Sequence, residues 1–178
     1  RGRPGRFRAL RGLERIHDVH LVDQRPLGRT PRANPLTYTR ALSPVRDLLA
    51  STPEARERGF GPGHFSFNVP GGRCETCKGQ GFEKVEMQFL SDVFISCAAC
   101  RGRRFREEVL AVRYRGLSIH DVLELTVDRA LEAFFDQKKI VSALTPLVRA
   151  GLGYIRLGQP LNTLSGGEAQ RLKLSRHL

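Results

Sequence analysis

Tryptophan is absent from this chain of 178 residues, methionine occurs once, and aromatic residues make up only 7%. Hydrophobic residues still reach 40%, so the composition predicts a folded core, but not a large one. No apolar run is long enough to span a bilayer, and we therefore expect no membrane as partner. The basic start Arg1–Arg6 lacks the apolar stretch of a secretory signal peptide.

Acidic residues are also scarce: 18 Asp and Glu stand against 30 Lys and Arg, which gives a formal net charge of +12. Such an excess of positive charge favours a polyanion as partner, most often nucleic acid. The alternative is a basic protein from a high-GC genome, in which Arg replaces Lys. The charge alone leaves both interpretations open.

Cysteine is rare too, and its positions organise the rest of the chain. The four cysteines are Cys74, Cys77, Cys97 and Cys100. Their spacing, C-x2-C-x19-C-x2-C, predicts one tetrahedral Zn²⁺ site, and four thiolates leave no open position for catalysis, so the zinc is structural. Gly79 and Gly102 follow the pairs at the same offset, where a metal knuckle needs positive φ. Two disulfides or four free thiols are the alternatives. Cysteines used for metal fit a reducing, cytoplasmic location.

The segment between the cysteine pairs is typical of a hairpin. Two β-prone runs, Phe82–Leu90 and Val93–Ser96, surround the polar pair Ser91-Asp92, so the zinc would hold the base of the hairpin. After the second pair, four arginines fall within Arg101–Arg106. Among them, Arg103 and Arg104 are candidate phosphate contacts, and a solvated Arg-rich surface is the alternative.

Elsewhere the pattern predicts short elements. We expect strands over His17–Asp23, Phe65–Val69 and Val109–Tyr114. We expect helices that open at Ser43-Pro44 and Thr52-Pro53, and others over Ile119–Leu125, Val127–Phe135 and Lys138–Ala150. Gly71-Gly72 is a candidate hinge before the cysteines.

A second motif, Leu164–Leu172, lies near the carboxyl end. Ser165 and Glu168 form a capping box, so a helix should start at Gly166. Gly166 and Gly167 leave the first-turn N–H groups bare, and together with the Ser165 hydroxyl these groups suit a phosphate. An ordinary capped helix is the alternative, although two glycines in a first turn cost helix stability without a local benefit.

Several stretches resemble known proteins. The run Leu164–Arg171 resembles the signature motif of ABC-type ATPases. The runs Gly151–Pro160, Asp23–Tyr38 and Phe65–Cys74 resemble the UvrA family, whose members belong to the bacterial UvrABC excinuclease. The resemblance covers essentially the whole chain, in order.

The resemblance implies an α/β fold: an incomplete ABC-type ATPase core with a helical signature domain that carries a zinc-binding β-hairpin insert. It places the chain in the C-terminal ABC half of the family. Residues 1–40 would belong to the nucleotide-binding core with its Q-loop. Residues 41–150 would form the signature domain, with the zinc module at about 71–107, and residues 151–178 would hold the signature motif and its helix.

The resemblance also implies binding residues. For ATP and Mg²⁺ in the full-length protein they are Gln24 in the Q-loop and Ser165, Gly166, Gly167 and Glu168 in the signature motif. The four cysteines would hold the zinc. For DNA the candidates are Arg29, Arg32, Lys84, Met87, Gln88 and Phe89, in addition to Arg103 and Arg104. Alternate hairpin residues must face the module's own core, so not all of these can reach DNA.

The implied function is recognition of damaged double-stranded DNA by the ATPase subunit of nucleotide excision repair, as a homodimer through its ABC domains and with the other excinuclease subunits. The chain has no Walker A motif and no Walker B acid. We therefore expect no ATP hydrolysis by this chain alone, and either the middle of a longer protein or a truncated relic.

Two other functions fit part of the pattern. A non-repair, drug-resistance paralogue of the same family would share all these motifs. A DnaJ-like zinc chaperone module fits Cys74–Gly81, which matches the repeat C-x-x-C-x-G-x-G. In the second pair, however, Arg104 stands where that repeat needs glycine, and the chaperone interpretation leaves Leu164–Arg171 unexplained.

Overall fold

The computed structural model describes residues 5–9, 11–23, 25, 27–28, 30, 32–87 and 93–178. Short helices dominate this part of the chain, and one two-stranded sheet accompanies them. The α-helices are α1 (Pro35–Tyr38), α2 (Leu42–Ala50), α3 (Pro53–Glu57), α4 (Glu107–Ala111), α5 (Ile119–Glu124), α6 (Val127–Ala133), α7 (Lys138–Arg149) and α8 (Gly166–Leu174). The 3₁₀ turns are η1 (Leu13–Arg15), η2 (Pro62–Phe65), η3 (Leu161–Thr163) and η4 (Ser175–His177). None of the described helices is long and apolar enough to cross a membrane.

Side-chain caps set several helix starts, as the sequence predicted. Thr52 caps α3, Thr126 caps α6, and Ser118 forms a reciprocal capping box with Asp121 at α5. Each cap satisfies a backbone N–H that has no partner within the helix, which stabilises a helix by about 1 kcal/mol. α2 starts two residues earlier than expected: Ala41 is its N-cap in place of Ser43, so Ser43 lies inside the helix and caps nothing.

The core is one continuous apolar cluster that runs from Leu36 in α1 to Leu172 in α8. α7 contributes Ile140, Leu144 and Leu147 from one face, in spite of Pro146 within the helix. Each fully buried side chain of this size contributes about 1.5–3 kcal/mol. The four cysteines form a second, separate buried cluster. The metal module therefore has its own small core beside the helical one.

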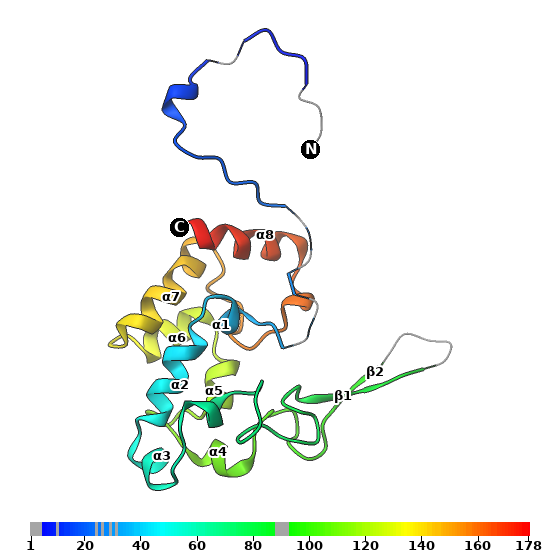
Figure 1. The fold of residues 1–178 in the computed structure, drawn as a ribbon, viewed down its shortest axis with the longest axis vertical. Helices are drawn as coiled ribbons and strands as arrows, with labels where there is room; N and C mark the ends of the chain where they lie inside the picture. The colour runs from blue at the N-terminus through cyan, green and yellow to red at the C-terminus, as the bar shows by residue number, and fades with distance from the viewer. Residues whose placement is uncertain are drawn as a thin grey trace.

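Three predicted strands are wrong. His17–Asp23 is not a strand: it runs outward beyond the helical body with Leu21 94% exposed, and none of the described residues pairs with it (Figure 1). Within 65–69, Phe65 is the last residue of η2 and most of the residues after it form bends, so this segment is not a strand. Within 109–114, α4 replaces the strand because the neighbours Val109 and Leu110 are both buried, which an alternating strand does not allow.

The predicted hairpin is present where the structure describes it. β1 (Phe82–Val85) pairs antiparallel with β2 (Val93–Ser96), with Phe82 opposite Ser96 and Val85 opposite Val93. Its predicted turn at Ser91-Asp92 lies outside the described residues. The two strands project from the helical body as one arm (Figure 1), and their side chains are mostly exposed on both faces.

Candidate metal centre and signature helix

Each cysteine pair forms the same backbone knuckle. In the first knuckle, the N–H of Gln80 donates to the carbonyl of Cys77 (3.0 Å), and the N–H of Gly81 donates to Cys77 Sγ (3.3 Å). In the second, the N–H of Arg103 donates to the carbonyl of Cys100 (2.9 Å), and the N–H of Arg104 donates to Cys100 Sγ (3.4 Å). N–H groups directed at sulfur stabilise the thiolate form that a metal requires.

The two knuckles also hold each other reciprocally. Cys97 N–H donates to the Gly81 carbonyl (3.0 Å), and Cys74 N–H donates to the Arg104 carbonyl (2.8 Å). The two bonds join equivalent atoms in opposite order, so the knuckles form a locally two-fold arrangement. This arrangement brings all four sulfurs to one point.

The two knuckles have the same backbone shape because residues at equivalent positions adopt left-handed conformations, with positive φ. In the first knuckle Lys78, Gly79 and Gly81 have φ of 49°, 80° and 84°. In the second the equivalent residues Arg101, Gly102 and Arg104 have φ of 51°, 81° and 71°. Arg104 thus adopts the left-handed conformation that its glycine counterpart adopts freely, at a cost of about 1–2 kcal/mol. Arginine at position 104, in place of the glycine found at position 81, therefore changes the side chain but leaves the backbone turn the same.

The four cysteine sulfurs are placed to hold one metal ion. All lie within 4.8 Å of one another, and all four side chains are buried. Cys77 Sγ and Cys100 Sγ are 3.7 Å apart, far beyond the length of a disulfide, about 2.05 Å. Burial raises the pKa of the Cys100 thiol to about 12, and neighbouring Cys77 adds to the rise. A cluster of thiolates here therefore needs a cation, and a set of four soft sulfur donors is typical of structural zinc.

The same geometry argues against a DnaJ-like module. That module uses four repeats for two zinc sites, whereas the residues that the structure describes contain one cluster of potential ligands built from both pairs.

Arginines join the module to the helical body. Arg32 Nη2 donates to the carbonyl of Lys78 in the first knuckle (2.9 Å). Arg104 Nη2 lies 3.5 Å from the carbonyl oxygen of Gly158, and its guanidinium carbon lies 5.6 Å from the centre of the Phe67 ring. Burial lowers the pKa of Arg104. The Arg104 side chain therefore packs between the second knuckle and the helical body.

Three further DNA candidates are described, two in the hairpin segment and one in the second knuckle. Lys84 is exposed and forms an ion pair with Glu86 (3.0 Å), Met87 is exposed, and Arg103 pairs with Glu107 (2.8 Å). Gln88, Phe89 and Arg29 lie outside the described residues. Sequence reasoning missed four apolar side chains that the hairpin exposes: Val85, Val93, Phe94 and Ile95. Their β-prone pattern suggested a buried face, which this projecting arm lacks.

The signature helix α8 begins as predicted. Ser165 Oγ accepts from Glu168 N–H (3.3 Å), and Glu168 Oε2 accepts from Ser165 N–H (2.8 Å). Tyr154 donates its hydroxyl to Glu168 Oε1 (2.8 Å), and Arg171 in turn donates to the Tyr154 oxygen (3.0 Å). The Ser165 N–H, followed by Tyr154, holds the pKa of Glu168 below its ordinary value. Glu168 is therefore a charged cap that stiffens the start of the helix.

The first turn of α8 is open. A methyl group added at Gly166 or Gly167 would meet no atom within 4 Å, and both residues are exposed. The amino end of α8 is therefore exposed at both glycines, and an exposed helix amino end is a position that favours an anion.

Gln24 lies outside the described residues, but its neighbours contact α8. Gln170 Nε2 donates to the Val22 carbonyl (3.4 Å), and Lys173 Nζ donates to the carbonyls of Asp23 (2.9 Å) and Arg25 (2.7 Å). Sequence reasoning missed both side chains. The sequence feature that could have revealed them is their spacing: residues three positions apart on a helix lie on the same face.

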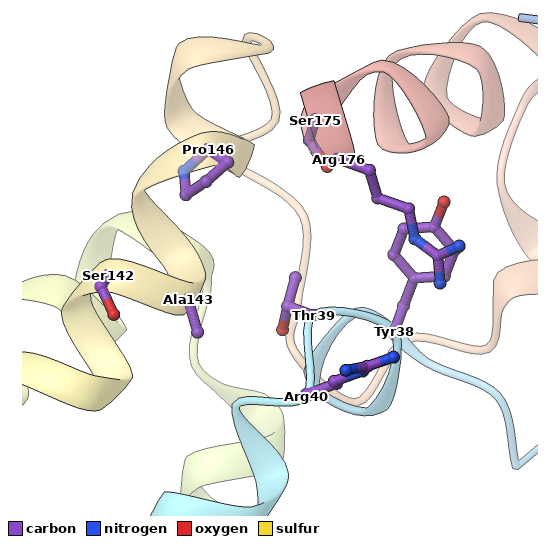
Figure 2. Close-up of a pocket in the computed structure, with 8 residues that line it drawn as sticks. All are labelled: Tyr38, Thr39, Arg40, Ser142, Ala143, Pro146, Ser175 and Arg176. Carbon is purple, nitrogen blue, oxygen red and sulfur yellow. The ribbon is translucent and has the colours of Figure 1, made fainter. Parts of the chain in front are cut away.

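A basic pocket of about 420 Å³ was also missed. It lies between the end of α1, α7 and η4, and Figure 2 shows the side chains that line it. The guanidinium carbon of Arg176 lies 4.2 Å from the centre of the Tyr38 ring, and Arg40 opens onto the same pocket. A cation stacked on an aromatic face stabilises the contact between the two chain segments. The pocket arises from residues more than 130 positions apart, which no local pattern reveals.

Comparison with known proteins identifies close relatives, although no family model matches the chain. The chain is 55% identical over 174 residues to "UvrABC system protein A" of Methanothermobacter thermautotrophicus and 54% identical over 175 residues to that of Thermus thermophilus. Each match covers 98% of this chain and 18% of the relative.

A solved structure agrees. The crystal structure of UvrA2 from Deinococcus radiodurans superposes with a TM-score of 0.84 and is 55% identical in sequence. This match covers 88% of the chain and 19% of the solved chain. The chain thus spans about a fifth of the length of its relatives. High identity over nearly all of the chain, together with the matching fold, means that this chain belongs, as a segment, to the UvrA family.

Proposed function

We propose that this chain is part of the damage-recognition ATPase of nucleotide excision repair. The carrying observation is identity of 54–55% to UvrABC system protein A over 98% of the chain. The cluster of four cysteines and the open signature helix support it. The chain spans only 18% of the length of these relatives. The activity of the whole protein is therefore itself proposed.

For the nucleotide, Ser165, Gly166 and Gly167 contact ATP that is bound at the opposing site of a homodimer formed through the ABC domains. The open first turn of α8 supports this role, because its N–H groups and helix dipole favour a phosphate. Glu168 fixes the cap, and Gln24 senses the γ-phosphate and Mg²⁺. The Walker A lysine and the Walker B acid are absent here, so the rest of the protein must supply them.

For DNA, structural Zn²⁺ holds the four cysteines and thereby the base of the hairpin. Lys84, Met87, Gln88 and Phe89 on the hairpin contact damaged double-stranded DNA, with Arg103 and Arg29 as further phosphate contacts. The exposure of both hairpin faces supports this role. We assign Arg104 to holding the module, because its side chain packs between the second knuckle and the helical body, and Arg32 to the same task through Lys78.

The proposal extends to organisation and setting. Residues 1–40 belong to the nucleotide-binding core in the C-terminal ABC half of the protein. Residues 41–150 form the signature domain with the zinc module, and residues 151–178 carry the signature motif. The protein works in the cytoplasm with the other excinuclease subunits.

Fluorescence anisotropy of the full-length protein on matched intact and lesion-bearing duplexes, across salt concentrations, tests the proposal. We expect a preference for the lesion that disappears when a chelator removes the zinc, and disappears likewise in Cys97→Ser. Lys139→Met on α7, far from the hairpin, is the matched control, since it removes one exposed positive charge. If the affinity for DNA falls with salt but is the same with and without the lesion, and with and without zinc, net charge alone explains the binding and the proposal fails.

A second candidate is a non-repair, drug-resistance paralogue. The identity of 55% to UvrA2 equals the identity to UvrABC system protein A, so the sequence match alone does not separate the two candidates. The first candidate predicts that deletion of the gene sensitises cells to ultraviolet light. The second predicts sensitivity to a DNA-binding drug without sensitivity to ultraviolet light.

A further inference from the structure

Lys173 uses all of its hydrogen-bonding capacity on one segment of the chain. An ammonium group has three donors. In Lys173 they meet three acceptors: the Asp23 carbonyl (2.9 Å), the Arg25 carbonyl (2.7 Å) and the Asp23 carboxylate. The side chain is only 18% exposed. Lys173 is therefore held in place by acceptors within the chain, and it has no donor left for an external phosphate.

The acceptors lie on both sides of Gln24. Asp23 precedes it and Arg25 follows it, and Gln170, one turn earlier on α8, holds the Val22 carbonyl (3.4 Å). The contacts span 148–150 positions of sequence, so they join two distant segments. They also hold the pKa of Asp23 below its ordinary value, with the Lys173 hydrogen bond as the largest cause. A charged donor shared among several oxygens makes a stronger contact than one neutral bond.

The helix that carries Lys173 also carries the signature motif. Ser165, Gly166 and Gly167 lie at its first turn, and Lys173 lies near its last residue, Leu174. A short helix is a stiff element, so displacement of its amino end moves its carboxyl end as well. Val22, Asp23 and Arg25 are thus bonded directly to the element that, under the proposed function, contacts the nucleotide of the opposing site.

We infer that Lys173, assisted by Gln170, is a positioning residue that couples the Q-loop segment of one nucleotide site to the signature helix of the other. The inference rests on the proposed function. Lys173 contacts no nucleotide itself. It holds Asp23 and Arg25, which stand on either side of Gln24 in the sequence, so occupancy at the signature motif of one site acts on the Q-loop segment of the other.

A double-mutant cycle in the full-length protein tests this inference. The variants are Lys173→Met, Gln24→Ala and their combination, with steady-state ATPase measured at varied ATP. We expect Lys173→Met to lower kcat about 10-fold to 100-fold, since a misplaced reactive group costs on this order. KM for ATP should change less than about threefold, because ground-state contacts remain. In the Gln24→Ala background Lys173→Met should have no further effect, and Lys173→Arg should retain part of the activity.

Lys139→Met, an exposed lysine on α7, is the matched control and should leave kcat unchanged. If Lys173→Met lowers kcat by the same factor in the parent and in the Gln24→Ala background, Lys173 only stabilises the folded protein, and the inference is overturned. Unchanged kcat in Lys173→Met would also overturn it. Ser165→Arg distinguishes failure of the proposed function from failure of the inferred coupling. If Ser165→Arg leaves the ATPase activity intact, the proposed function fails as well. If it abolishes the activity while the effects of Lys173→Met and Gln24→Ala are additive, only the coupling fails.

Discussion

Arg32 and Lys78 lie 46 positions apart, yet Arg32 Nη2 donates a hydrogen bond of 2.9 Å to the Lys78 carbonyl oxygen. The bond connects the segment after the predicted Q-loop to the first metal knuckle. We expect Arg32→Ala to loosen this junction and to speed amide exchange at Gly79, Gln80 and Gly81 about tenfold, the effect of one charge-assisted bond. Hydrogen exchange measured by mass spectrometry checks this.

Arg129→Ala is the matched control for Arg32→Ala, because Arg129 is exposed and pairs with Glu132 on its own helix. Exchange in the knuckle should not change in this control. If Arg32→Ala also leaves the exchange unchanged but weakens DNA binding with a smaller salt dependence, Arg32 contacts phosphate instead of holding the module.

Gly79 and Gly102 occupy equivalent positions but differ in their surroundings. Both have φ near +80°, so alanine at either position costs about 1 kcal/mol of backbone strain. A methyl group at Gly79 would lie 2.1 Å from the Phe67 carbonyl oxygen, whereas at Gly102 its nearest neighbour is the Gly81 oxygen at 3.9 Å. We expect Gly79→Ala to lower the free energy of unfolding about 2 kcal/mol more than Gly102→Ala, because overpacking adds to the strain. Urea unfolding with zinc present measures the difference, and equal losses would contradict the expectation.

The sequence was sufficient where the signal is local. The pairs Ser118/Asp121 and Ser165/Glu168 predicted their capping boxes, because each box depends on residues within one turn. The cysteine spacing predicted the metal cluster because each C-x2-C pair is itself a local motif, and two matching pairs together supply four ligands. The pattern that marks Gly71-Gly72 as a candidate hinge does not reveal that a methyl group at Gly72 would lie 1.8 Å from the His64 carbonyl oxygen. That glycine serves close packing, which depends on a distant segment and leaves no local trace.

The wrong strands have a different cause. An extended, β-prone segment becomes a strand only when a neighbour pairs with it, and sequence patterns do not specify the neighbour. Among the described residues no strand pairs with His17–Asp23, whereas Phe82–Val85 pairs with Val93–Ser96. The left-handed Arg104 was likewise unpredictable from residue type, since the backbone of the knuckle imposes its φ.

The pH dependence of α8 should follow Glu168. Hydrogen bonds from Ser165 N–H and then from Tyr154 lower its pKa, so the folded state favours the carboxylate. The contribution to stability is fully present above the ordinary pKa of glutamate and is lost as the pH falls through the lowered folded value. Glu168→Gln should therefore melt at a lower temperature than the parent at neutral pH, and the gap should close in acid. A gap that is independent of pH would contradict the charged cap.

Loss of the metal should unfold the module and spare the helical body. The four cysteines form a buried cluster separate from the main core, and the hairpin exposes most of its side chains, so little apart from the knuckles holds it. We expect Cys97→Ser to reduce bound zinc below about one ion per chain, because three cysteines do not close the tetrahedral shell.

In the same variant, trypsin should cleave after Lys84 much faster than in the parent, because the strand pairing around Lys84 depends on the knuckles. The helical circular dichroism signal should remain nearly unchanged, since the apolar cluster from Leu36 to Leu172 keeps its contacts. Ser96→Ala, at the neighbouring exposed position, is the control and should keep its zinc. A loss of helical signal together with the zinc would show that the two cores fold as one cooperative unit, and that the metal stabilises the signature helix as well as the hairpin.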